Sequence, residues 1–169
     1  RIAEHLAEQG HRVLLATTDP ADHLTGRFAK LPENLTVAAI DPQVETERHV
    51  REVLETTGSQ LDPEARALLE EELRSPCIEE IAVFTAFAKV VAAGANQFVV
   101  LDTAPTGHTL LLLDTTEAYH REVSRNTGLS EEVRMLLPRL RDPAFTKVLL
   151  VTLPEATPVH EADALGMDL

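Results

Sequence analysis

Three short runs of aliphatic and β-branched residues, without polar alternation, constrain the fold of this chain most strongly. They span residues 12–17 (RVLLAT), 97–101 (QFVVL) and 147–152 (KVLLVT). Continuous apolar runs of this length are typical of strands buried on both faces of a parallel sheet. A shorter run at residues 35–40 is expected to form an edge strand. Because helical patterns separate the runs, we predict an α/β fold with a three-layer, doubly wound, mostly parallel sheet.

The stretch from about residue 44 to 94 is predicted to be a helical insertion within a single domain, residues 1–169. Its three expected helices span residues 44–57, 62–74 and 77–93. Asp62-Pro63 and Ser75-Pro76 each supply an N-cap followed by proline, which favours a helix start at both places. Glycines stand where helices are expected to end, at Gly10, Gly58 and Gly94.

Composition limits the partners and the compartment of the protein. The 28 acidic residues outnumber the 15 basic ones, for a formal charge of −13, so a nucleic acid is an unfavourable partner. The only basic cluster, at residues 134–141, is interpreted as a solvated helix face. Cys77 is the only cysteine, which excludes an intramolecular disulfide and favours the cytoplasm. No apolar run approaches the roughly 20 residues of a membrane span, so membrane contact is expected only through a partner.

Both ends of the sequence suggest that the domain continues beyond them. Residue 1 falls inside a helical pattern without a preceding cap. A helix predicted to start at Thr157-Pro158 has scarcely begun when the sequence stops. We therefore expect a domain that is incomplete at both ends.

Polar residues follow the first predicted strand, where doubly wound sheets bind their ligands. The segment there reads Thr17-Thr18-Asp19-Pro20. The Asp19 carboxylate is a candidate for positioning water or for holding Mg²⁺ through water. The alternative is that Asp19 only caps the next turn, since Asp-Pro often initiates turns.

The second predicted strand also ends in a carboxylate. Four apolar residues followed by Asp102 match the Walker B pattern, in which the aspartate reaches Mg²⁺ at a nucleotide phosphate. Residues 103–107 (TAPTG) then supply hydroxyls, a rigid turn and a permissive glycine, which is the composition expected of a loop that responds to a γ-phosphate. An ordinary strand-to-helix turn is the alternative for this loop.

The phosphate-binding loop that such carboxylates normally accompany is absent from the sequence. None of the three lysines, Lys30, Lys89 and Lys147, follows a glycine, and no G-x-x-x-x-G-K-[ST] occurs. The sequence also lacks a nucleophile elbow, H-E-x-x-H and paired-cysteine metal spacing, which weakens other hydrolase and structural-zinc interpretations.

Four segments resemble the arsenite-pump ATPase family. VLLATTDPADHL is similar to its first switch segment and FVVLDTAPTGHTLLLLD to its signature sequence. RSPCIEEIAVF and TKVLLVTLPEATPVHEA resemble the C-terminal, second nucleotide-binding half of that family. The resemblance implies a MinD-like P-loop NTPase fold whose P-loop lies upstream of Arg1.

The resemblance also implies roles for individual residues. Asp19 resembles the switch carboxylate near attacking water and Mg²⁺, and Asp102 resembles the Mg²⁺-side carboxylate of the signature sequence. The accompanying nucleotide and switch residues are Thr18, Pro20, Thr103, Pro105, Thr106 and Gly107. Ser75, Cys77 and His108 resemble residues that contact As(III) or Sb(III) between two halves. A thiol at a helix N-terminus favours the thiolate these soft ions require, although a lone cysteine is more often a small buried hydrophobe.

The function implied is hydrolysis of ATP with Mg²⁺, coupled to arsenite or antimonite efflux through a membrane pump subunit. The partners implied are that pump and a second nucleotide-binding half, in the same chain or in a dimer mate. The protein is then cytoplasmic and, through the pump, peripheral at the inner membrane. One alternative is an ATPase that targets tail-anchored proteins, for which Met135 and Met167 are too few methionines. Another is a non-catalytic metalloid-binding or interaction fragment, the 169 residues alone being expected to be inactive.

Overall fold

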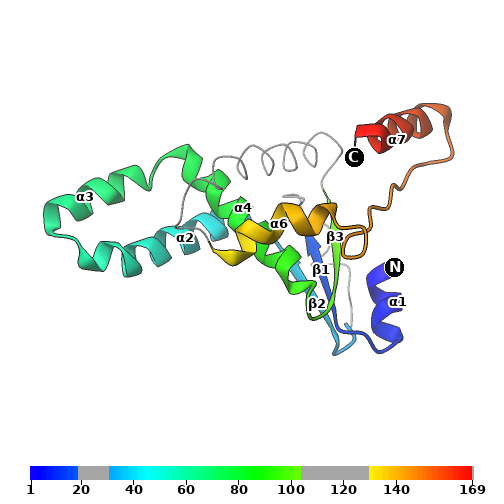
Figure 1. Cartoon of the computed structure of the whole chain (residues 1–169), viewed down its shortest axis with the longest axis horizontal. Helices are drawn as coiled ribbons and strands as arrows, with labels where there is room; N and C mark the ends of the chain where they lie inside the picture. Colours follow the sequence, from blue (N-terminus) through cyan, green and yellow to red (C-terminus); the bar gives the residue numbers. More distant parts are fainter. Residues whose placement is uncertain (19–30, 104–129, 169) are drawn as a thin grey trace. The chain divides into compact units, whose positions relative to one another are not determined.

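The computed structural model describes residues 1–18, 31–103 and 130–168 of the chain. It divides into two compact units, Arg1–Leu137 and Pro138–Leu169, which we describe separately. Figure 1 traces the elements along the chain.

The first unit contains a parallel sheet of three described strands. These are β1 (Val13–Thr17), β2 (Leu35–Ala39) and β3 (Phe98–Asp102), in the order β2-β1-β3. In the register, Val13 pairs with Leu35 on one side and Phe98 on the other, and Thr17 pairs with Ala39 and Asp102. The predicted α/β class and the first two apolar strands are therefore confirmed. The shorter run is also a strand, at the edge of the described sheet.

Helix α1 (Ile2–Glu8) packs on one face of this sheet. The buried residues of this cluster are Ala3, Ala7, Val13, Leu15 and Leu35. The helix ends before Gly10, whose φ of 88° is a left-handed conformation that glycine adopts without strain. The Asn34 side-chain amide donates to the carbonyl oxygens of Ala7 and His11, both at 2.7 Å, and so joins the end of α1 to the start of β2.

Four helical elements lie between β2 and β3 in the chain. They are α2 (Pro42–Thr56), the 3₁₀ turn η1 (Gly58–Gln60), α3 (Pro63–Glu72) and α4 (Pro76–Ala93). The Asp62 carboxylate caps α3 by accepting from the backbone N–H groups of Glu64 and Ala65. Ser75 is the N-cap of α4 but its side chain makes no capping hydrogen bond. The three predicted helices are thus present, while the boundaries of an insertion and of a single domain stay predictions.

These helices differ sharply in burial. Six residues of α4 are buried: Ala82, Phe84, Ala86, Phe87, Ala88 and Val91. No residue of α2 or α3 is buried. Helix α6 (Glu131–Arg141) buries Val133 and Leu136 and contains Pro138, where the second unit begins.

No helix in the described part of the chain has the length and apolar character needed to cross a bilayer.

The second unit corrects one prediction, because residues 147–152 do not form a strand. They have no regular secondary structure, and Leu149 is 65% and Val151 91% exposed. A strand requires a neighbour for its backbone hydrogen bonds, and the described residues of this unit contain no other strand. The apolar pattern therefore lacks the pairing that would make it a strand. The helix predicted near Thr157 is present as α7 (Ala156–Asp168).

Candidate functional site

The carboxyl ends of the three strands meet at one edge of the sheet. Thr17 is in register with Asp102, and the Thr18 backbone N–H donates to the Asp102 carbonyl oxygen at 3.2 Å. On the other side of β1, the Ile40 N–H donates to the Thr17 carbonyl oxygen at 3.0 Å. Thr18 and Asp102 consequently lie side by side at this edge. The structure thus brings together the two polar segments that the sequence places 84 residues apart, from Thr18 to Asp102.

Among the described residues, two carboxylates lie at this edge, and their surroundings differ. Asp41 follows β2 and caps α2, its Oδ1 accepting from the N–H groups of Gln43 at 2.9 Å and Val44 at 3.2 Å. Asp102 is exposed, and its carboxylate forms no hydrogen bond or ion pair with another described residue. Asp102 is therefore the carboxylate at this edge that is available to a ligand. The capping role of Asp41 was not predicted, although Asp41-Pro42 carries the same capping signal as Asp62-Pro63.

Replacing Asp41 by alanine should lower stability, because two backbone N–H groups at the start of α2 lose their acceptor. We expect the free energy of unfolding to fall by about 1 kcal/mol. Asp102→Ala, at the same edge, should leave it nearly unchanged. Chemical denaturation of the intact protein measures both values. Equal losses in the two variants would contradict this assignment of the carboxylates.

The threonines at the edge also differ in exposure. Thr18 is only 7% exposed, whereas Thr103 is exposed. Thr103 is therefore accessible to solvent next to Asp102, while Thr18 is packed within the edge of the sheet. The remaining predicted nucleotide and switch residues lie outside the described residues: Asp19, Pro20, Pro105, Thr106 and Gly107.

The candidate metalloid residues are only partly described. Ser75 and Cys77 are both exposed at the start of α4, so Cys77 is not a buried hydrophobe. His108 lies outside the described residues. Helix α4 has 18 residues, a length of about 27 Å, and Cys77 lies at the end remote from the turn into β3. Among the described residues, no group of three or more His, Cys, Asp or Glu side chains is arranged to hold a metal ion.

A sequence model of a protein family, described as "Anion-transporting ATPase", matches residues 1–140. The chain belongs to the anion-transporting ATPase family. It is 55% identical, over 99% of its length, to an arsenical pump-driving ATPase of Escherichia coli. It is 54% identical over the same share to an arsenical pump-driving ATPase of Acidiphilium multivorum. An ATPase ASNA1 homolog 1 of Paramecium tetraurelia is 33% identical over 67% of the chain and 37% of that relative.

The family match extends over the sheet and all helices up to α6. The family resemblance and the parallel α/β fold predicted from the sequence are therefore confirmed. The chain spans 29% of the length of the two arsenical pump-driving ATPases. The assignment of this family member to one particular nucleotide-binding half stays a prediction.

Proposed function

We propose that the intact protein hydrolyses ATP and thereby drives the efflux of arsenite or antimonite through a membrane pump subunit. The observation that carries this proposal is the sheet edge, where Thr18 and Asp102 adjoin and the Asp102 carboxylate is free of described partners. Ligands of doubly wound sheets bind at this edge. The identity to proteins named arsenical pump-driving ATPases supports the choice of substrate.

The residues at the edge fit a nucleotide bound with Mg²⁺. An exposed carboxylate without other partners offers the oxygen ligands that Mg²⁺ prefers, directly or through water. When bound, Mg²⁺ neutralises negative charge on the phosphates. Asp102 would hold the ion, and the neighbouring Thr103 hydroxyl would orient toward the phosphates.

Hydrolysis also requires a positioned water and a loop that senses the γ-phosphate. Asp19, directly after buried Thr18, would position the attacking water. Pro20 would stiffen this turn, while the loop that contains Pro105, Thr106 and Gly107 would rearrange around the phosphate. The lysine and backbone amides of a P-loop would come from residues outside this chain.

Cys77 is proposed as a metalloid ligand, together with Ser75 and His108. The exposed thiol lies in the first turn of α4. Thiolates are the preferred ligands of soft ions such as As(III) and Sb(III). Because one thiolate makes a weak site, further ligands would come from a second nucleotide-binding half, in the same chain or in a dimer mate. Metalloid binding would then draw the halves together and raise the ATPase rate.

Cys77→Ser in the intact protein tests the proposed function. We expect the stimulation of ATPase activity by antimonite to fall about fivefold or more, the lower range of allosteric coupling. The basal rate should remain unchanged, because Cys77 lies at the far end of α4 from β3. Glu80→Gln, an exposed change on the same helix, is the control and should respond like the parent. Identical stimulation of Cys77→Ser and parent over a full titration would exclude Cys77 from the site.

The tail-anchored-targeting alternative has less support. The ASNA1 homolog is a more distant relative than the arsenical pump-driving ATPases. Met135 and Met167 are the only methionines, and neither lies in α2, α3 or α4. A Met-rich apolar surface suited to variable membrane segments is thus absent from these helices. The non-catalytic alternative predicts metalloid binding without any ATPase activity in the intact protein, which the same assay measures.

A further inference from the structure

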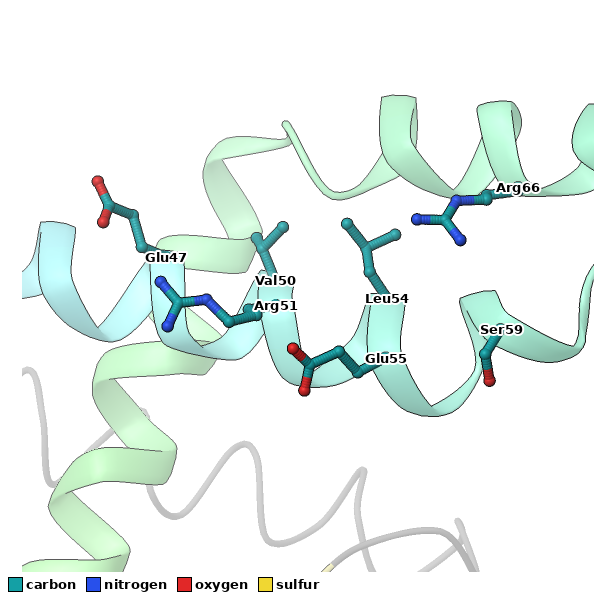
Figure 2. A pocket seen from close by; sticks show the side chains of 7 residues that line it. All are labelled: Glu47, Val50, Arg51, Leu54, Glu55, Ser59 and Arg66. Carbon is teal, nitrogen blue, oxygen red and sulfur yellow. The ribbon is translucent and has the colours of Figure 1, made fainter.

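A groove of about 700 Å³ lies between α2 and α3, near η1. Figure 2 shows the side chains of Val50 and Leu54 projecting from α2 toward α3, which carries Arg66. Glu47 and Glu55 line the groove beside them. An apolar centre with charged margins is the surface that accepts an amphipathic helix.

The two helices that form the groove bury few of their apolar side chains, although α2 also packs against α4. Neither contains a buried residue, and Leu68 of α3 is 60% exposed. Helix α3 has ten residues, fewer than the roughly 12–15 that an isolated helix needs to be stable in water. Most helical stability in proteins comes from packing of an apolar face. A further surface that covers Val50 and Leu54 would add to the packing that α2 already has against α4.

The charge around the groove indicates what kind of surface fits it. Residues 41–80 contain twelve acidic side chains and four basic ones. Two of the four arginines already form ion pairs within their own helices, Arg48 with Glu45 at 2.7 Å and Arg66 with Glu70 at 3.1 Å. The Glu47 and Glu55 carboxylates have no ion-pair partner among the described residues, although Arg51 also lines the groove. This acidic surplus favours a basic partner and repels anionic lipid or nucleic acid.

We propose that the groove between α2 and α3 docks a basic amphipathic segment of the membrane pump partner. The identity of that partner rests on the proposed function. Membrane proteins carry an excess of Lys and Arg in their cytoplasmic loops. No described helix of this chain could cross a bilayer, and a protein that docks on the pump from the cytoplasm would meet these loops. Apolar residues of the segment would cover Val50 and Leu54, and its basic residues would pair with Glu47 and Glu55.

Matched substitutions on α2 test the docking. Val50→Glu places a charge in the groove, whereas Val44→Glu places one on the same helix at an exposed residue outside the groove lining. Binding of the intact protein is measured to inside-out vesicles from cells that produce the pump, and to vesicles from cells that lack it. We expect Val50→Glu to weaken pump-dependent binding about tenfold or more, and Val44→Glu less than about twofold. Basal ATPase activity should be unchanged in both variants.

A double variant tests the docking independently of any folding defect in Val50→Glu. Reversing the charge of both exposed carboxylates in Glu47→Lys/Glu55→Lys should weaken binding and reduce its dependence on salt. Glu52→Lys, on α2 outside the groove lining, is the control. Parent-like binding by both groove variants would overturn the proposal. It would also be overturned by equal binding to vesicles without the pump, which indicates a lipid surface, or by a change of oligomeric state in Val50→Glu, which indicates a second copy of the chain.

These outcomes are separate from failure of the proposed function. An intact protein whose ATPase does not respond to antimonite would contradict the proposed metalloid coupling. Pump-dependent vesicle binding would still show whether the groove docks the pump.

Discussion

The 169-residue chain on its own is expected to hydrolyse no ATP above background. Its sequence contains no glycine-rich loop with a lysine, and none of its three lysines follows a glycine. Phosphoryl transfer depends almost entirely on preorganised donors and cations around the transferring group. The proposed site residues at the sheet edge, Asp102 and the threonines, would supply hydrogen-bond acceptors and hydroxyls but no cation. Release of phosphate from ATP with Mg²⁺, measured on the purified chain, tests this expectation.

The control is a longer chain that includes a P-loop, purified in the same way and expected to be active. The 169-residue chain should also aggregate readily, because it leaves apolar surface exposed. Phe98 in β3 is about half exposed, and Val148, Leu149 and Val151 are more exposed still. Mg²⁺-dependent activity that follows the 169-residue chain through purification would contradict the prediction, and with it the need for a P-loop.

Asp102→Asn in the intact protein is expected to reduce Mg²⁺-supported ATP turnover by about 100-fold or more. The substitution retains the size of the side chain but removes the negative charge that we propose holds Mg²⁺. The fold should be preserved, since the Asp102 carboxylate has no partner among the described residues, and its backbone carbonyl still accepts from Thr18. Steady-state kinetics over a range of Mg²⁺ concentrations measures the effect.

Asp41→Asn is a matched control for this variant. It makes the same chemical change at the same edge of the sheet, and asparagine caps a helix as well as aspartate does. Turnover should therefore be unchanged.

Asp19→Asn should lower mainly the rate of hydrolysis, with less effect on the Mg²⁺ dependence, if Asp19 positions water. Parent-like turnover in both Asp102→Asn and Asp19→Asn would reduce these carboxylates to structural roles.

Local patterns in the sequence predicted most of the secondary structure. The apolar runs at residues 12–17 and 97–101 are parallel strands, and Asp62-Pro63 starts a helix as predicted. These features depend on neighbouring residues, because strand character follows from apolar side chains and a cap bonds to N–H groups two or three residues away. The same local reasoning failed for residues 147–152, since strand formation there depends on a second strand.

The sequence by itself determined the α/β class, the starts of α3 and α4, the membership of the family and the residue types available for a nucleotide site. Only the tertiary structure decided which of those residues lie side by side and which are exposed and available to a ligand. The register of β1 and β3 places Thr18 against Asp102, and the fold exposes Cys77. Asp41 and Asp102 both lie at the carboxyl ends of strands, yet Asp41 caps a helix and the Asp102 carboxylate has no partner among the described residues. The physical reason is that pairing and exposure depend on contacts between residues far apart in the chain, which local patterns do not encode.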